Sequence, residues 1–269
     1  MVRHFKRGYV VIKERSSFKY FSKSDGSFND LMSKSIAFHD LKQSTFIFPR
    51  VKDSNPEERY IEYETLTNIV NIREVYIRFM KGDLSECEAK KIFSDVGKAL
   101  ADMHKLLKLK NKDLILKNEK FSSLLKGKEI SFGKNCAFLH TDYGFSNIFI
   151  NLDQKICIID PYANNYTSSN IVNAWGPVEI DIATFLMCLE GLIPFKYLLY
   201  LSGKKIDILK KAFLAGYYSI VGYEQDREHL KKATMLFLDV YLYHRYKSRV
   251  LVMAIKVYIF VIKKVKFSS

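Results

Sequence analysis

Four polar residues near the middle of the chain have the types and spacing that phosphoryl transfer requires. His140, Asp142 and Asn147 share one short segment, and Asp160 ends an apolar strand thirteen residues after Asn147. Phosphoryl transfer spreads negative charge in its transition state, so an enzyme must hold Mg²⁺ against the phosphates and orient the attacking hydroxyl. Mg²⁺ prefers hard oxygen ligands, commonly one or two carboxylates with phosphate and water. The pattern therefore predicts a magnesium-dependent phosphotransfer centre.

Each of these residue types suits one part of that chemistry. The amide oxygen of Asn147 and the carboxylate of Asp160 are the expected Mg²⁺ ligands, and Asp142 is expected to accept the hydroxyl proton or to orient the hydroxyl. The alternative is ordinary loop chemistry, in which Asp and Asn side chains make turn hydrogen bonds. An Asp and an Asn five residues apart occur often, but the full set behind an amphipathic helix does not. We therefore favour the functional interpretation.

The flanking sequence predicts the helices and strands that would position these residues. Residues 85–107 are predicted to form a helix that Ser85 caps, with Glu88 completing a capping box and apolar residues forming one stripe. Residues 137–160 change to short apolar runs, which predict paired strands around a turn at 151–154. Helical structure is also predicted at 179–192, at 206–222 and over most of 226–263.

The N-terminal part has a different pattern. Strand-like runs occupy residues 9–13, 17–21, 46–48 and 60–63, with one helical pattern at 28–42. A short connection is expected near residues 62–66. The order predicts an α+β fold with a small, strand-rich N-terminal lobe over 1–64 and a larger, mainly helical C-terminal lobe over 65–269.

A family resemblance supports this organisation. Residues 140–147, His-Thr-Asp-Tyr-Gly-Phe-Ser-Asn, resemble the catalytic loop of the aminoglycoside phosphotransferase and choline kinase superfamily, protein-kinase-like enzymes that phosphorylate small molecules. Residues 97–104 are similar to the helix that precedes that loop, and 176–183 to the later G-x-x-x-x-D-L-A segment. Asp160-Pro161, in place of D-F-G, resembles the fructosamine-kinase branch. The likeness is specific between residues 85 and 190, and it implies a two-lobed protein-kinase-like fold.

The resemblance also implies roles for individual residues. Asp142 would be the catalytic aspartate, and Asn147 and Asp160 would hold Mg²⁺. His140 would link the loop to the strand that carries Asp160, and Asp181 would brace the loop from a buried helix start. The implied activity is transfer of the γ-phosphate of ATP to an alcohol group (EC 2.7.1.-) of a small molecule or saccharide.

The nucleotide side of the site is less well defined. Residues 10–13, Val-Val-Ile-Lys, resemble the V-A-I-K strand whose lysine contacts the phosphates, and Lys19 competes with Lys13 for this role. No G-x-G-x-x-G loop occurs in the chain, and the helical pattern at 28–42 contains no Glu to pair with that lysine. Glu62 and Glu64 lie where a hinge backbone would meet adenine. The missing glycine loop motivates an alternative, a catalytically inactive kinase-fold binding module.

Composition and charge bound the remaining possibilities. The formal net charge is +14, but lysines outnumber arginines 33 to 10 and are spread along the chain. This reflects either an AT-rich coding bias or a preference for anionic ligands, and no specific nucleic-acid partner is expected. The four cysteines are far apart and form no C-x-x-C pair, which predicts buried free thiols in a reducing compartment. No apolar run is long enough for a membrane span, and the apolar run near the N-terminus is too short for a signal peptide, so a cytoplasmic protein is expected.

Two interpretations of the C-terminal segment stay open. Residues 245–269 are both basic and apolar, so they could pack as the last helix of the C-terminal lobe or contact an anionic membrane surface peripherally. Aromatic residues of the C-terminal helices, Tyr217 and Tyr218 among them, either line an acceptor pocket or pack between helices. Neither the acceptor nor the oligomeric state follows from the sequence.

Overall fold

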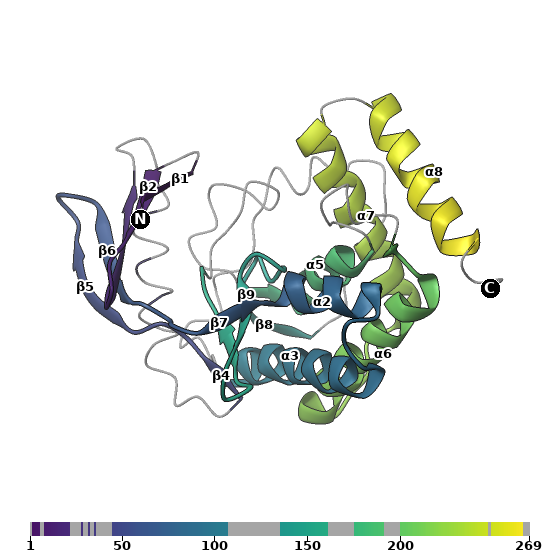
Figure 1. Ribbon diagram of the computed structural model, residues 1–269, viewed down its shortest axis with the longest axis horizontal. Coiled ribbons are helices and arrows are strands. Elements are labelled where there is room, and N and C mark those ends of the chain that lie inside the picture. Colours follow the sequence, from purple (N-terminus) through teal and green to yellow (C-terminus); the bar gives the residue numbers. More distant parts are fainter. Residues whose placement is uncertain are drawn as a thin grey trace.

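The structure is a computed structural model that describes residues 2–5, 8–21, 28, 32, 35, 45–106, 135–160, 175–190, 200–246 and 249–265. A strand-rich part and a helical part lie side by side in it (Figure 1). This arrangement confirms the predicted α+β class. The boundary at residue 64 stays a prediction, because one short strand from the N-terminal part pairs within the other part, as described below.

A five-stranded antiparallel sheet forms the strand-rich part. Its strands, in spatial order, are β1 (Val2–Phe5), β2 (Gly8–Ile12), β3 (Ser16–Phe21), β6 (Tyr60–Glu64) and β5 (Val51–Asn55). Because side chains alternate along a strand, the two faces of the sheet differ. The rings of Phe18, Tyr20 and Tyr60 cluster on the outer face, whereas Ile61 and Tyr63 are buried on the inner face. Lys19 pairs in register with Ile61 and therefore shares the inner face.

A second sheet lies beside the first, toward the helices (Figure 1), and its strand β9 follows the polar loop of residues 140–147. Its strands, in spatial order, are β4 (Phe46–Ile47), β10 (Ile156–Ile158), β9 (Ile148–Asn151) and β7 (Ile69–Asn71). Strand β4 pairs in parallel with β10, so a segment of the N-terminal part is joined directly to the strand that precedes Asp160. A two-stranded ribbon of β8 (Cys136–Phe138) and β11 (Trp175–Pro177) flanks the polar loop.

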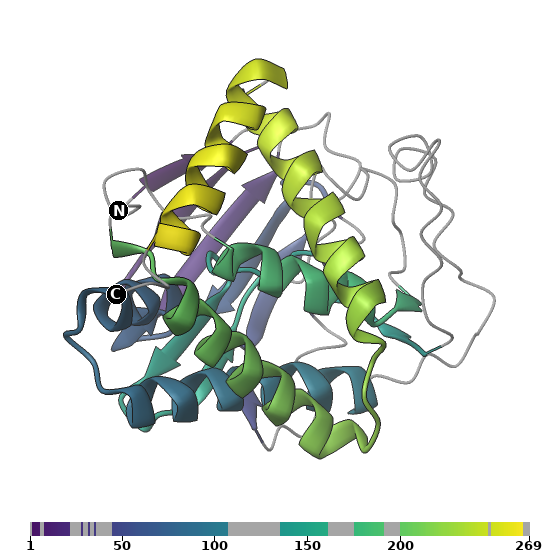
Figure 2. The same cartoon turned by 90° about the vertical axis from the view of Figure 1, so that its right-hand side faces the viewer.

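Six helices make up most of the rest of the described chain. They are α2 (Ile72–Lys81), α3 (Glu86–Leu106), α5 (Glu179–Leu189), α6 (Gly203–Val221), α7 (Arg227–Tyr246) and α8 (Arg249–Val265). Every residue of α5 is buried, and the neighbouring helices α3, α6 and α7 surround it (Figure 2). Beyond its first turn α5 is almost entirely apolar, and such a helix is stable only inside a core. The N-terminal end of α5 therefore provides a rigid anchor for the loop beside it.

Two glycines let α3 and α6 approach closely. A Cβ atom at Gly97 would lie 2.0 Å from the backbone oxygen of Phe213, and one at Gly216 would lie 2.0 Å from that of Ser94. Both distances are far below van der Waals contact, so no larger residue fits at either position without separating the helices. This close packing places the C-terminal half of α6 against α3, next to the polar loop.

Most predicted elements are present, with some differences. The Ser85 hydroxyl accepts a hydrogen bond from the Glu88 amide at 3.2 Å, which confirms the predicted cap of α3. The helical structure expected over most of 226–263 is divided between two helices, α7 and α8. Four short strands, β1, β5, β7 and β11, and helix α2 were not predicted from the sequence. Of the helix expected at 28–42, only Phe28, Met32 and Ser35 are described, and they are helical.

Candidate active site

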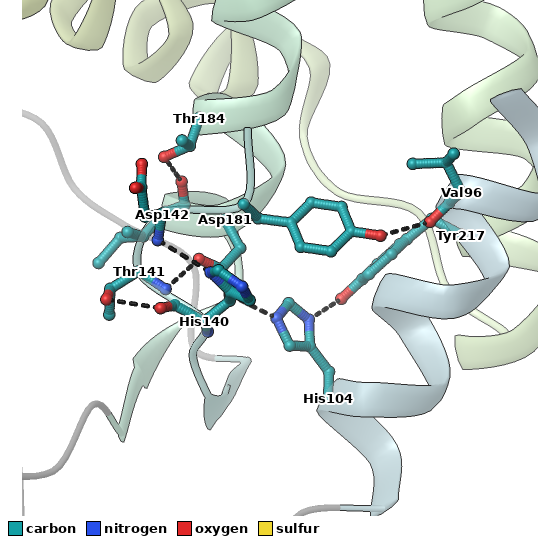
Figure 3. A network of polar contacts seen from close by, with 10 residues as sticks. Val96, His104, His140, Thr141, Asp142, Asp181, Thr184 and Tyr217 are labelled. Carbon is teal, nitrogen blue, oxygen red and sulfur yellow. Dashed lines mark hydrogen bonds and ion pairs between the residues drawn. The ribbon is translucent and has the colours of Figure 1, made fainter. Parts of the chain in front are cut away.

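Asp181, at the start of α5, holds the polar loop through its backbone. Its side chain is completely buried and accepts hydrogen bonds from the backbone N–H groups of His140 (2.6 Å) and Thr141 (2.8 Å) (Figure 3). A buried carboxylate that accepts several N–H groups at these distances forms strong hydrogen bonds. The loop is thus fixed to a core helix immediately before Asp142.

A second set of contacts continues from Asp181 to α3 and α6. The His104 Nε2 atom lies 3.1 Å from Asp181 Oδ2, and His104 Nδ1 lies 2.9 Å from the Tyr217 hydroxyl. In a neutral imidazole, Nε2–H donates to the carboxylate and Nδ1 accepts from the phenol. Burial raises the pKa of Tyr217, so the phenol keeps the proton that it donates. Tyr217 therefore packs between helices, and it supports the loop indirectly.

His140 connects the loop to the end of β10. Its Nδ1 atom accepts a hydrogen bond from the Asp142 amide at 3.2 Å, so its Nε2–H donates to the Ile159 carbonyl at 2.9 Å. These two contacts fix the neutral tautomer of the imidazole. His140 thus joins the loop to Ile159, the residue before Asp160, which supports the linking role expected for His140.

Asn147 lies against Asp142. Its Nδ2 group donates to both the backbone oxygen and the Oδ2 atom of Asp142, each at 2.9 Å. Because the amide nitrogen is committed to Asp142, the amide oxygen is directed away from that carboxylate. The Asn147 backbone oxygen accepts from the Ile159 amide at 2.9 Å. Asp142, Asn147 and the residue before Asp160 are therefore held within one hydrogen-bonded unit.

Two residues of this unit have strained backbones. Thr141 has φ = 69° and Asp160 has φ = 51°, in the left-handed region that costs a non-glycine residue about 1–3 kcal/mol. For Thr141 the two hydrogen bonds through its own amide and hydroxyl, to Asp181 and to the His140 carbonyl, offset that cost. Such strain concentrates at functional sites, where the surrounding contacts specify a particular side-chain direction.

Lys19 reaches the unit from the N-terminal sheet. Its Nζ atom lies 2.8 Å from Asp160 Oδ1, with the lysine side chain 13% exposed and the carboxylate 39% exposed. Lys13 instead lies in the turn after β2, with its Nζ atom 4.6 Å from the centre of the outer-face Phe18 ring. The geometry therefore favours Lys19 over Lys13, although Lys13 matches the V-A-I-K pattern more closely. That pattern marks β2, whereas the lysine that contacts Asp160 belongs to β3.

The expected hinge residues lie on the opposite face from Lys19. Glu62 pairs with the outer-face residue Phe18, and Glu64 is exposed, so neither carboxylate points toward Asp160. The Glu64 amide donates to the Arg50 carbonyl at 2.8 Å and is already used within the sheet. The Thr65 amide likewise donates to the Arg15 carbonyl, at 3.4 Å.

The donor set near Asp160 suits Mg²⁺. The Asn147 amide oxygen and the partly exposed Asp160 carboxylate are both hard oxygen ligands, as Mg²⁺ prefers. Within the described ranges, no three His, Cys, Asp or Glu side chains group together to hold a metal ion. Such a small protein donor set fits an ion that takes its other ligands from phosphate and water, as in phosphotransferases.

The fold is shared with solved small-molecule kinases. A glucosamine kinase in complex with glucosamine, ADP and inorganic phosphate superposes with a TM-score of 0.61 at 12% identity, covering 97% of this chain and 78% of that chain. A streptomycin–ATP–APH(2")-IIa ternary complex gives a TM-score of 0.60 at 13% identity, covering 94% and 88%. The chain therefore shares its fold with these two small-molecule kinases.

Further comparisons agree with the fold. A choline/ethanolamine kinase family protein from Mesorhizobium loti gives a TM-score of 0.51 at 10% identity, covering 100% of this chain and 87% of that chain. No protein-family profile matches the sequence, and no curated protein matches it significantly. At such low identity, the shared fold is what these comparisons show, and the role of each site residue has to be argued from its geometry.

The structure adds residues that the sequence analysis did not assign. His104 is one, because its partner Asp181 lies 77 positions away and no local pattern links them. Cys188 is another: its thiol would lie 3.3 Å from a Cβ atom at Gly144, so it forms the wall behind the loop. Burial, together with the charge of Asp142, raises the pKa of Cys188 to about 12. The thiol is therefore a packing group at neutral pH.

Proposed function

We propose that the protein is an ATP- and Mg²⁺-dependent phosphotransferase that transfers the γ-phosphate to a hydroxyl of a small molecule or saccharide. One observation carries the proposal, the 2.8 Å contact between Lys19 and Asp160. It brings a cation from the strand-rich part to the hydrogen-bonded unit of Asp142 and Asn147. A cation, hard metal ligands and a carboxylate at one place are the parts that phosphoryl transfer requires.

On the nucleotide side, Lys19 would contact the phosphates, and Asn147 and Asp160 would hold Mg²⁺. The bound ion would neutralise charge that develops on the phosphates. The inner face of the sheet adds Tyr63, whose hydroxyl lies 2.8 Å from the Ser35 hydroxyl. Burial, and after it the charge of Asp160, raises the pKa of Tyr63. Tyr63 therefore stays neutral beside the proposed phosphate site and does not repel a polyanion.

On the acceptor side, Asp142 would orient the attacking hydroxyl and accept its proton. The Asn147 amide donates to Asp142 Oδ2, which fixes the carboxylate, and the His140 imidazole fixes the Asp142 backbone. A carboxylate held in this way can position a hydroxyl without the free-energy cost of reorganising during the reaction. Similar proteins have been solved with glucosamine and with streptomycin, which supports an acceptor that carries sugar hydroxyls.

Thermal unfolding tests the nucleotide site. Saturating Mg²⁺-ATP at 100 times its dissociation constant should stabilise the wild type by about 2.7 kcal/mol, which corresponds to roughly 5–10 °C for a chain of this size. Asp160→Ala should abolish the shift. Asp153→Ala is the matched control, because Asp153 is an exposed residue in the turn of the same hairpin, and it should keep the full shift.

Turnover tests the proposed chemistry. ADP release is measured with a panel of sugars and amino alcohols, and Asp142→Asn should lower the rate by about 10²–10⁴-fold with the best acceptor. Near-normal turnover in that variant would exclude the role of Asp142. A nucleotide-dependent shift with no turnover on any acceptor would favour the inactive binding module instead.

A further inference from the structure

The last helix exposes a continuous apolar stripe. In α8 the side chains of Val250, Met253, Val257, Phe260 and Val261 are between 48% and 81% exposed. Their spacing of three, four, three and one residues places them along one side of the helix. Isolated exposed apolar residues are common, but a stripe of five along a single helix marks a surface that binds something.

The opposite side of α8 is already packed on the protein. Val252 is buried, and Ile255 and Tyr258 pack against the core. Lys256 Nζ also forms an ion pair with Asp239 Oδ1 of α7 at 2.5 Å. Figures 1 and 2 place α8 at the end of the molecule opposite the five-stranded sheet, where it lies on the outer side of α7. The helix is thus docked through one side while its stripe faces outward.

The charge of this region is uniformly positive. Asp239 is the last acidic residue of the chain, and residues 240–269 contain seven basic residues: Arg245, Lys247, Arg249, Lys256, Lys263, Lys264 and Lys266. This segment alone has a formal charge of +7, which is half of the net charge of +14. Acidic and basic residues are mixed along the rest of the chain, whereas residues 240–269 contain basic residues and no acidic ones.

We propose that α8 is an interfacial anchor that lies in the plane of an anionic membrane surface. A helix that exposes an apolar side within a basic segment binds at the boundary between headgroups and acyl chains, where acidic lipids attract Lys and Arg residues. Among the described residues, no helix is both long and apolar enough to span a bilayer. The stripe would therefore enter the surface layer without crossing it.

The charge and the stripe together disfavour other occupants. A second copy of the chain would have to bring another +7 segment against the first, which like-charge repulsion opposes. A nucleic acid would match the charge, but its phosphates would leave Val, Met and Phe side chains without apolar contact. An anionic bilayer satisfies both features. The inference does not depend on the proposed phosphotransfer activity.

Co-sedimentation with vesicles tests the anchor. The full chain is mixed with phosphatidylcholine vesicles with and without phosphatidylglycerol. We expect binding that is at least about tenfold tighter with the anionic lipid and that weakens as salt is added. The double variant Met253→Ser/Phe260→Ser should bind these vesicles at least about tenfold more weakly, because two large apolar groups no longer enter the lipid.

Two controls distinguish the stripe from exposed apolar surface in general and from a loss of folding. Leu152→Ser removes a similarly exposed apolar residue, 76% exposed in the turn between β9 and β10, and it should leave vesicle binding unchanged. The thermal midpoint of the double variant should match the wild type, since both residues face outward. Equal binding to neutral and anionic vesicles, no binding to either, or binding unaffected by Met253→Ser/Phe260→Ser would overturn the proposal. Sedimentation showing a dimer that this double variant abolishes would assign the stripe to a second copy instead.

Discussion

Replacing Asp181 with alanine should disorganise the polar loop while leaving the rest of the fold in place. Its carboxylate accepts hydrogen bonds from the amides of His140 and Thr141 and from the His104 ring. In Asp181→Ala these donors lose their partner inside a fully buried site. The strained backbone of Thr141, with φ = 69°, also loses one of the two hydrogen bonds that offset its cost.

The size of the effect follows from those contacts. Each buried donor left unpaired costs about 1–3 kcal/mol, so the two backbone amides alone should lower the free energy of unfolding by about 2–6 kcal/mol. With roughly 2–4 °C per kcal/mol at this chain length, the thermal midpoint should fall by at least about 4 °C. A displacement of the loop by about 1 Å would also lower any turnover by about 10²-fold.

Thermal unfolding and hydrogen exchange measure the two consequences separately. Asp95→Ala is the matched control, because Asp95 forms helix-surface ion pairs with Lys91 and Lys98, which are worth about 0.3–0.5 kcal/mol each. In Asp181→Ala the amides of His140 and Thr141 should exchange faster than in the wild type, while those of α3 keep their relative protection. If Asp181→Ala unfolds like Asp95→Ala and protects both loop amides, Asp181 does not brace the loop.

Three further results are expected. Gly216→Ala should lower the free energy of unfolding by about 3 kcal/mol or more in urea titrations, because its Cβ would lie 2.0 Å from a backbone oxygen of α3; a loss under about 1 kcal/mol would contradict this packing. Burial raises the pKa of Cys157 to about 11 and that of Cys188 to about 12, from an ordinary 9.0. The folded state thus holds more protons than the unfolded state above about pH 9, so the free energy of unfolding should fall from about pH 9 to 11. The fall should be less steep in Cys188→Ala. An identical slope in that variant would argue against a raised pKa of Cys188. Lys19→Met should reduce the Mg²⁺-ATP shift of the thermal midpoint while Lys13→Met keeps it, and the reverse order would restore the V-A-I-K assignment.

The sequence was most informative where the signal is local. The spacing of Asp142, Asn147 and Asp160 predicted that these positions lie near one another, because a loop followed by a hairpin brings them together, and hydrogen bonds join Asn147 to Asp142 and to Ile159. The helix over α3 was equally clear, since a capping serine and a long apolar stripe are local signals. The two-lobed arrangement followed from the change between strand-like and helical patterns.

The features that could not be predicted from the sequence depend on contacts between residues far apart in the chain. The choice between Lys13 and Lys19 turns on which face of a sheet each residue occupies, and the pattern V-V-I-K favours β2 although the contact with Asp160 comes from β3. The link from Tyr217 through His104 to Asp181 joins α6, α3 and α5, and no spacing predicts it. The exposed side of α8 could not be predicted either, because apolar residues lie on both sides of this helix and the sequence does not show which side packs on the protein.

The ion pair between Lys19 and Asp160 has a consequence for the order in which ligands enter. Each residue is the counter-ion of the other, and the same two groups are the expected partners of phosphate and of metal. Free ATP would place phosphates beside an uncompensated carboxylate, and a free divalent cation would place positive charge beside an ammonium group. When the metal and the nucleotide bind together, the Lys19–Asp160 ion pair is replaced by two ion pairs, Lys19 with phosphate and Asp160 with the metal. We therefore expect the site to admit the metal–nucleotide complex as a single unit and to discriminate against either component alone.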